Sequence, residues 1–257
     1  DHKPTSYAIS SSTPQFVVLS FDGSKSLSML EETLDFQKEM VARRRPVRFT
    51  YFINAAYFLT EDNAKIYNPP RAPAGYSNIG YSNSKEDIAK RVELFNTAYE
   101  LGNEIGSHAV GHFNGYRWTE AEWKKEFDSW KGILYNVSAN TKKADVPQPR
   151  FLKDVIGFRA PDLGVNENLY RTLKDFNFVY DTSGIGAPDL WPMKDTFGIW
   201  HIPLGVIELG PQRLPTISMD YSIWILQSGG YDNVKRGTVE WERQYKEVFE
   251  AFMSYFN

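Results

Sequence analysis

Two histidines four residues apart carry the clearest chemical signal in this chain of 257 residues, which has four histidines in all. His108 and His112 are separated by Ala-Val-Gly. On a helical turn this spacing places both imidazoles on one face, where they can bind one divalent metal ion. The alternative is a pair of surface or capping histidines. A carboxylate such as Asp22 would complete a His-His-Asp set that leaves positions open for water and substrate.

Three other ionisable residues stand just after apolar runs that are typical of buried strands: Asp22, Arg159 and Asp181. Pro161 prevents the strand before Arg159 from continuing as a paired ladder. A guanidinium fixed at this point can orient a carboxylate and keep it charged, although an ordinary surface salt bridge is the alternative. Asp181 is by itself more often a turn or capping residue, so Asp22 is the stronger candidate of the two.

Alternating strand and helix patterns must position these residues. Short apolar runs predict strands at residues 16–19, 47–53, 104–107, 155–158, 178–180, 199–203 and 206–209. Apolar residues at helical spacing predict helices at residues 28–41, 85–101, 119–134, 166–175 and 239–256. This alternation predicts an α/β fold with a parallel sheet. In such folds ligands bind at the carboxyl ends of the strands, where the candidate residues stand.

Composition and charge exclude several classes of protein. The chain is 42% hydrophobic and 24% charged, has no cysteine and carries a formal net charge of −3. These values exclude a disordered tail, a collagen and a disulfide scaffold. The basic residues are dispersed, so no nucleic acid partner is expected, and no apolar run reaches the ~18 residues of a transmembrane segment. We expect residues 1–14 to be a flexible N-terminal lead-in and residues 15–257 to form a single domain.

Four short motifs occur in an order that resembles one known family, the polysaccharide deacetylases, which are the NodB-homology carbohydrate esterases of family 4. The resemblance extends from residue 16 to about residue 185. The motifs are Leu19-Ser20-Phe21-Asp22-Gly23, residues 104–112 around the two histidines, Phe158-Arg159-Ala160-Pro161 and Tyr180-Asp181-Thr182-Ser183. A weaker likeness to the chitin-deacetylase-like branches lies at Ser218-Met219-Asp220-Tyr221.

The resemblance implies a distorted (β/α) barrel of about seven strands and metal-dependent removal of N-acetyl groups from polysaccharides that contain GlcNAc. In this family an Asp-His-His set holds zinc or another divalent ion, a second Asp is the base, an Arg orients that base and a His protonates the leaving amine. Carried over, His108 and His112 are metal ligands with zinc as the expected ion, and Arg159 orients the base. Asp162 follows Pro161 and is expected to offer a backbone N–H to the oxyanion, and Tyr221 is a candidate to contact substrate.

Two departures from the family pattern bear on catalysis. The family has a second Asp after the first, whereas here Gly23 follows Asp22, so Asp22 is a candidate for the base, for the metal ligand or for both. The family also has a His at the end of a late strand, but no His follows His201, which we interpret as a core or strand-surface residue. Either the strand with the acid lies beyond residue 257, or this protein has lost its acid.

The expected substrate is peptidoglycan or a chitin-like polymer. A carbohydrate-binding protein that has lost activity on the same fold, and an esterase that removes O-acetyl groups, are the alternatives. Because Asp1 is not a native start, a removed signal peptide and a secreted or periplasmic location are expected. Aromatic residues should line an open groove for the polymer, and we expect at least half of the candidates to be core instead. These candidates are Trp191, Trp200, Tyr221 and Trp224.

Overall fold

The structure, a computed structural model, describes residues 16–143 and 145–255, which form two compact units. The larger unit comprises Leu19–Gly184 and Trp191–Pro203. Of the described residues, the smaller unit contains 16–18, Ile185–Leu190 and 204–255. The predicted lead-in, residues 1–14, lies outside the described residues. Every candidate site residue except Tyr221 belongs to the larger unit.

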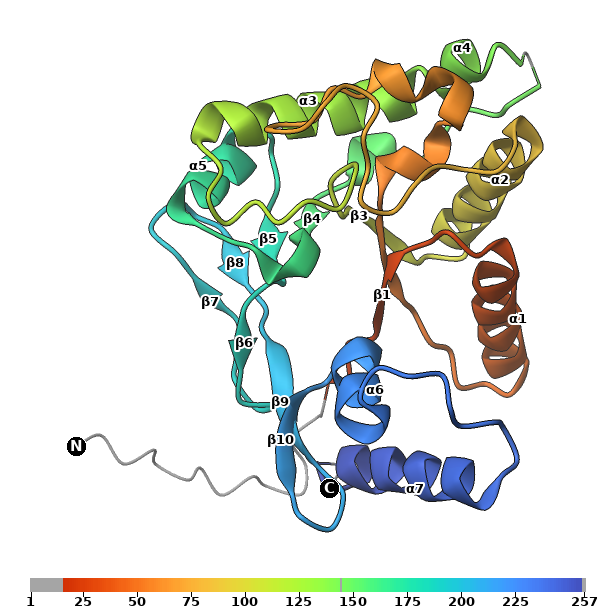
Figure 1. The fold of residues 1–257 in the computed structure, drawn as a ribbon, viewed down its shortest axis with the longest axis vertical. Coiled ribbons are helices and arrows are strands. Elements are labelled where there is room, and N and C mark those ends of the chain that lie inside the picture. Colours follow the sequence, from red (N-terminus) through yellow and green to blue (C-terminus); the bar gives the residue numbers. More distant parts are fainter. Residues whose placement is uncertain (1–15, 144, 256–257) are drawn as a thin grey trace. The chain divides into compact units, whose positions relative to one another are not determined.

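A seven-stranded, mostly parallel sheet is the centre of the larger unit (Figure 1), which confirms the predicted α/β fold class and the number of strands. In spatial order the strands are β1 (Ser20–Gly23), β2 (Thr50–Ile53), β3 (Glu104–Ser107), β4 (Gly157–Phe158), β5 (Tyr180–Asp181), β8 (Trp200–His201) and β7 (Met193–Lys194). Only the edge strand β7 is antiparallel to its neighbour. Because Asp22 pairs with Phe52, and Phe52 with Gly106, the carboxyl ends of β1, β2 and β3 are level.

Five α-helices accompany this sheet, and the predicted ones are confirmed to within a few residues. They are α1 (Leu27–Ala42), α2 (Lys85–Glu100), α3 (Glu120–Tyr135), α4 (Val137–Thr141) and α5 (Glu167–Asp175). Their starts follow from the sequence, since a Ser, Thr or Asn side chain accepts a backbone N–H at the first turn of four of them. On α3, Thr119 and Glu122 form the expected capping box. The structure adds short 3₁₀ helices, among them Ala55–Phe58 and Pro161–Leu163.

The first strand begins later than the sequence predicts. The apolar run at residues 16–19 is not a strand, and Phe16 and Val18 are 74% and 71% exposed. Strand β1 begins at Ser20, which pairs with the first residue of β2, Thr50. An apolar run becomes a buried strand only where a neighbouring strand can pair with it. Because β2 begins at Thr50, it has no residues that could pair with the run before Ser20.

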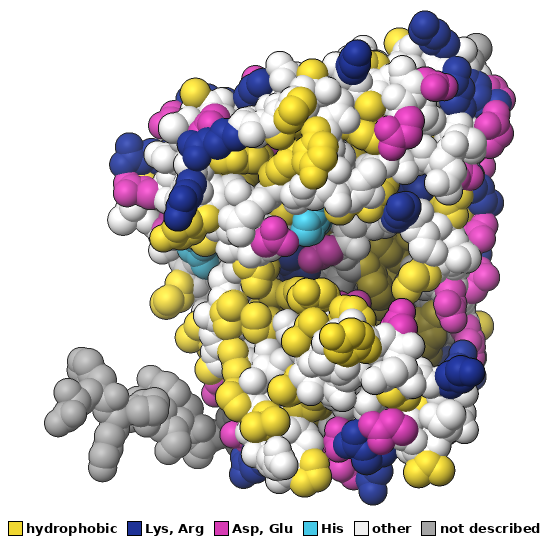
Figure 2. Space-filling view, viewed as in Figure 1, with side chains coloured by type: hydrophobic (Ala, Val, Ile, Leu, Met, Phe, Trp, Pro, Cys, Tyr) yellow, Lys and Arg dark blue, Asp and Glu magenta, His cyan; other side chains and the backbone are white. Residues whose placement is uncertain are grey.

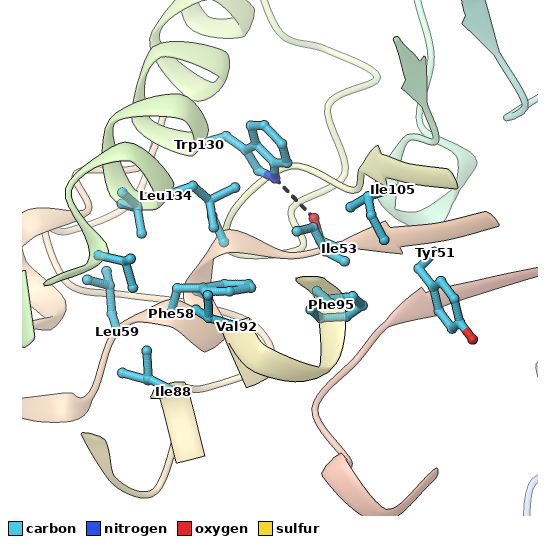
Figure 3. Close-up of a cluster of buried hydrophobic side chains, with 14 of the residues drawn as sticks. Tyr51, Ile53, Phe58, Leu59, Ile88, Val92, Phe95, Ile105, Trp130 and Leu134 are labelled. Atoms are coloured by element: carbon cyan, nitrogen blue, oxygen red, sulfur yellow. Dashed lines mark hydrogen bonds between the residues drawn. The ribbon is translucent and has the colours of Figure 1, made fainter. Parts of the chain in front are cut away.

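Aromatic and aliphatic side chains from α2, α3 and β2 form the main core (Figure 3). Within it, the indole Nε1 of Trp130 donates a hydrogen bond to the carbonyl oxygen of Ile53 at 3.0 Å. The backbone N–H of His108 donates to the same oxygen at 2.9 Å. The core therefore fixes the end of β2 and the first residue of the histidine loop together.

The smaller unit contains a three-stranded sheet and two helices. Its strands are β6 (Ile185–Gly186), β9 (Leu204–Leu209) and β10 (Leu214–Ile217), and its helices are α6 (Asp220–Ser228) and α7 (Val239–Met253). A small core is formed by Ile207, Leu209, Ile223 and Ala251. Nowhere in the described parts of the chain is a helix both long enough and apolar enough to cross a bilayer.

The expectation that at least half of four late aromatic residues are core is wrong. Trp191 is 70% exposed, Trp200 41%, Tyr221 60% and Trp224 37%. The strands in this part of the larger unit, β8 and the edge strand β7, are each two residues long, so they cover little of a large side chain. Helix α6, which carries Tyr221 and Trp224, has a single buried residue, Ile223.

Candidate active site

An ion pair between Asp22 and Arg159 joins the ends of β1 and β4. Arg159 Nη1 donates to Asp22 Oδ1 at 2.9 Å, which is the contact expected from the sequence. The Arg159 side chain is 5% exposed and that of Asp22 is 29% exposed. One carboxylate oxygen is thereby fixed by a buried cation, while the side chain as a whole still reaches solvent. This is the geometry that a general base for a bound water requires.

Thr182 and the ring of Phe52 fix the guanidinium of Arg159. Its Nη2 donates to Thr182 Oγ1 at 2.8 Å and its Nε donates to the Thr182 carbonyl oxygen at 3.3 Å. The guanidinium carbon lies 4.6 Å from the centre of the Phe52 ring, close enough for a cation–π interaction. Thr182 directly follows Asp181, so the fourth sequence motif contributes here by anchoring the arginine.

His108 and His112 lie together, but not on a helix as the spacing suggested. Their ring centres are 5.0 Å apart, with the rings at 71°. Residues 108–112 form no helix, and Ala109 and His112 have φ values of 56° and 57°. Left-handed residues turn the chain back within five residues, and such conformations in residues other than glycine cluster at functional sites. In Figure 2, histidine and acidic side chains are adjacent on the drawn face.

The surroundings of His108 favour a neutral imidazole with a lone pair that can bind a metal ion. The side chain is buried, and its Nδ1 donates to the carbonyl oxygen of Arg159 at 2.7 Å. Burial lowers the pKa of His108 to about 4, and the neighbouring Asp22 carboxylate opposes this shift only in part. With its proton fixed on Nδ1, the ring keeps a lone pair on Nε2. In metal sites, a backbone carbonyl that accepts the N–H of one ring nitrogen orients the other nitrogen toward the metal in the same way.

A buried carboxyl group that the sequence did not single out supports the histidine loop from behind. Glu126 of α3 accepts a hydrogen bond from the Val110 N–H at 2.8 Å and from the Tyr67 hydroxyl at 2.8 Å. Burial raises the pKa of Glu126 to about 7. The residue occupies an inward position on an amphipathic helix, where an apolar side chain is expected, and this mismatch is the signal that could have identified it.

The chemistry of the donors only partly fits the expected metal site. Two adjacent imidazoles, one of them neutral and oriented by a backbone carbonyl, suit a divalent ion. Across residues 16–143 and 145–255, however, no group of three His, Cys, Asp or Glu side chains is arranged to hold a metal. Asp22 Oδ1 is paired with Arg159, and Gly23 offers no side chain. The structure therefore brings two imidazole donors together. Among the described residues, no carboxylate completes a three-residue metal site with them.

The two residues expected to contact substrate fall in different places. Asp162 lies beside His112, with 3.8 Å between Asp162 Oδ1 and His112 Nδ1, and it has a left-handed φ of 51°. Tyr221 belongs to the smaller unit, where it lies in the first turn of helix α6 next to Asp220 and is exposed.

The larger unit also has a cavity of about 490 Å³ along the chain that follows His112. It is lined by residues 70–72, 113, 114 and 116–118.

A second histidine cluster lies at the end of β8. His201 Nε2 is 3.0 Å from Asp195 Oδ2, and its Nδ1 is 3.7 Å from Asp181 Oδ2. The carboxylates of the buried Asp181 and of Asp195, which face the two ring nitrogens, raise the pKa of His201. Both ring nitrogens face carboxylates, which agrees with the interpretation of His201 as a structural residue.

Three of the solved structures that are similar to this chain are an esterase, a deacetylase and a pseudoenzyme. A family 4 carbohydrate esterase from Streptomyces lividans is 14% identical, with 65% of this chain and 61% of that chain covered and a TM-score of 0.40. A peptidoglycan deacetylase from Bacillus subtilis is 16% identical, with 63% and 55% covered and a TM-score of 0.38. A CE4 family pseudoenzyme from Bacillus anthracis is 12% identical, with 63% and 40% covered and a TM-score of 0.37.

The chain spans between 40% and 61% of the length of these three matched chains. No protein-family model matches the sequence, and a search of curated proteins found no match. With TM-scores this low, the matches add no argument about activity. Two of these three structures are described as members of carbohydrate esterase family 4, the family that the sequence motifs resemble, and the third is described as a peptidoglycan deacetylase.

Proposed function

We propose that this protein is a metal-dependent hydrolase that removes N-acetyl groups from polysaccharides containing GlcNAc, such as peptidoglycan or a chitin-like polymer. The Asp22–Arg159 ion pair beside His108 is the observation that carries the proposal. A partly exposed carboxylate with a fixed orientation, next to two adjacent imidazoles, is a suitable arrangement for deprotonating a water. The four motifs that resemble the deacetylase family support the same reaction.

The residues have separate roles in this proposal. His108 and His112 would hold a divalent ion, expected to be zinc, which when bound polarises the acetyl carbonyl and acidifies water. Asp22 accepts the proton of the attacking water, and Arg159 keeps the carboxylate oriented. The backbone N–H of Asp162, beside His112, is the candidate donor to the oxyanion. No histidine within the described residues is free to protonate the leaving amine, because His201 is held by two carboxylates.

The proposed substrate is a polymer outside the cytoplasm, so we also propose a secreted or periplasmic location. The cavity that follows His112 is lined by Phe113, Tyr116 and Trp118 together with two arginines. Aromatic faces and cationic groups of this kind suit the apolar faces and hydroxyl groups of sugar rings. Tyr116 is 65% exposed, which leaves its ring available to a ligand.

A second candidate function is carbohydrate binding without hydrolysis. It is favoured by one observation: among the described residues, no group of three His, Cys, Asp or Glu side chains is arranged to hold a metal. Without a bound metal the site could still position a sugar. The two candidates therefore differ in metal binding and in acetate release.

Acetate release from N-acetylglucosamine oligomers and from peptidoglycan fragments tests the proposal. We expect release that stops with a chelator and returns when zinc or cobalt is added, and that is lost in Asp22→Asn. Oligosaccharide binding with no acetate release, whether or not zinc or cobalt is bound, would establish the binding protein instead. Release from O-acetylated xylan alone would identify an O-acetyl esterase.

A further inference from the structure

Asn54 has a buried side-chain oxygen without a partner. The residue directly follows β2 and is 0% exposed. Its Nδ2 donates to the carbonyl oxygen of His108, so the amide orientation is fixed, whereas Oδ1 has no hydrogen-bond partner. Leaving a buried acceptor without a hydrogen-bond partner is energetically unfavourable. A group outside the described chain is therefore needed to satisfy this oxygen.

The position of Asn54 makes the missing hydrogen bond more informative. Asn54 stands at the N-cap of the 3₁₀ helix Ala55–Phe58, where an Asn oxygen ordinarily accepts a backbone N–H from the first turn. Here the side chain makes no such capping bond. The oxygen is directed elsewhere, and the bond from Nδ2 to His108 shows that the amide faces the histidine loop.

Gly23 gives a second, independent observation at the same place. A Cβ atom built on Gly23 would have Asn54 Oδ1 as its only non-neighbouring contact within reach, at 3.8 Å. The space that a side chain at residue 23 would occupy is therefore open and is bordered by this oxygen. In the family that the motifs resemble, the residue after the first Asp carries the carboxylate ligand, and in this chain that carboxylate is absent.

We propose that Asn54 Oδ1 is the third protein donor to the divalent ion held by His108 and His112, in place of a carboxylate from residue 23. The inference rests on the proposed function. Amide oxygens are ordinary ligands of hard divalent cations, and an ion would satisfy the oxygen that the chain leaves unpaired. The resulting donor set, two imidazoles and an amide, is free of negative charge. We therefore expect weaker metal binding than a carboxylate would give.

Metal binding by three variants tests this role. Binding of Co²⁺ and Zn²⁺ is measured by isothermal titration and by the visible absorption of Co²⁺, with the whole chain and no substrate. Asn54→Ala removes both the oxygen and the N–H donor. Asn54→Asp has the same shape and keeps an oxygen, but it cannot donate to the His108 carbonyl. Asn78→Ala is the matched control, because Asn78 Nδ2 donates in the same way to the carbonyl oxygen of His112, at 2.9 Å.

If Oδ1 is a ligand, Asn54→Ala should weaken binding by at least the roughly 10- to 100-fold that outer-shell partners are worth. Asn54→Asp should bind at least as tightly as the unaltered protein and should change the Co²⁺ spectrum, and Asn78→Ala should have a much smaller effect. Weaker binding by Asn54→Asp would mean that only the N–H donor matters, which overturns the proposal. Unchanged binding by Asn54→Ala would overturn it too.

The Asp variant decides the question even if Asn54→Ala does not fold, because it preserves shape and size. The unaltered protein separates this inference from the proposed function. If neither the unaltered protein nor His108→Ala binds Co²⁺ or Zn²⁺, the proposed function and the ligand role of Asn54 are both overturned. Metal binding that depends on His108 but not on Asn54 would overturn the ligand role of Asn54 alone.

Discussion

His108 and His201 both follow or end parallel strands of one sheet, yet their surroundings give them opposite properties. His108 is buried against a backbone carbonyl, and its pKa is lowered to about 4. His201 lies between Asp181 and Asp195, and its pKa is raised. A carbonyl partner fixes a neutral ring with one free lone pair, whereas two carboxylates favour a cation with no free nitrogen.

This difference shows that the location at a strand end is not sufficient to identify a functional histidine. The group bound to the second ring nitrogen decides whether the first can bind a ligand. The His108 cluster also contains an arginine that fixes a partly exposed carboxylate, whereas the carboxylate of Asp181 in the other cluster is fully buried. The other carboxylate of that cluster, Asp195, is 19% exposed, compared with 29% for Asp22, so the oriented carboxylate beside His108 is the more accessible to water.

The largest expected effect is on the rate of acetate release, and it should distinguish Asp22 from Asp195. Asp22→Asn should lower the rate of acetate release by about 10²- to 10⁴-fold, because a general base is lost. Asp195→Asn in the other cluster should change the rate far less. Metal affinity measured on the same Asp22 variant then shows its role: retained affinity identifies a base alone, and lost affinity identifies a ligand as well.

Replacing the histidines compares the clusters directly. His108→Asn should reduce the affinity for Zn²⁺ or Co²⁺ by well over the roughly 10- to 100-fold typical of outer-shell changes, while His201→Asn should leave it nearly unchanged. Isothermal titration measures both. Equal losses in the two variants would contradict the assignment of metal binding to the first cluster.

Glu126 should matter through the backbone that it holds. Glu126→Gln keeps the size of the side chain but disturbs a buried network with Val110 and Tyr67, so unfolding in urea should show a loss of about 1–3 kcal/mol. The control on the same helix is Glu120→Gln, which removes an exposed pair with Lys124 that is worth at most about 0.5 kcal/mol. Similar losses in both variants would exclude a special role for Glu126.

The two histidines should also impose opposite pH dependence on the stability of the metal-free protein. Between pH 6.5 and about 4, His108 is protonated in the unfolded chain but stays neutral in the folded protein. His108 therefore lowers the free energy of unfolding as the pH falls. His201 has a raised pKa, so its contribution is complete below pH 6.5 and is lost as the pH rises through the folded value.

Urea unfolding as a function of pH tests this contrast, with a limiting slope of about 1.4 kcal/mol per pH unit for each group. The difference between His108→Gln and the unaltered protein should change with pH only below about 6.5. The difference for His201→Gln should change only above it. The subtraction removes the contribution of Glu126, whose pKa of about 7 makes stability fall as the pH rises from 4.5 to 7.

Local signals in the sequence determined most of the elements and the general position of the site, although the predicted strand at residues 16–19 and the helical turn at the two histidines were wrong. Capping residues fixed the start of α3 at Thr119, and strand β3 has the predicted bounds. The strand ends selected Asp22, His108 and Arg159, and the contact between Asp22 and Arg159 followed from the parallel fold. Such signals act over a few residues, so the sequence displays them directly.

Only the tertiary structure decided which polar groups are buried and what satisfies them. Asn54 meets His108 and Glu126 meets Tyr67 across separations of 54 and 59 residues, and no local pattern encodes either contact. The left-handed turn that joins the two histidines is likewise stabilised from α3, by the carboxyl group of Glu126. The physical reason is that burial of a polar atom costs free energy unless a distant partner is brought to it, and packing alone determines whether that partner arrives.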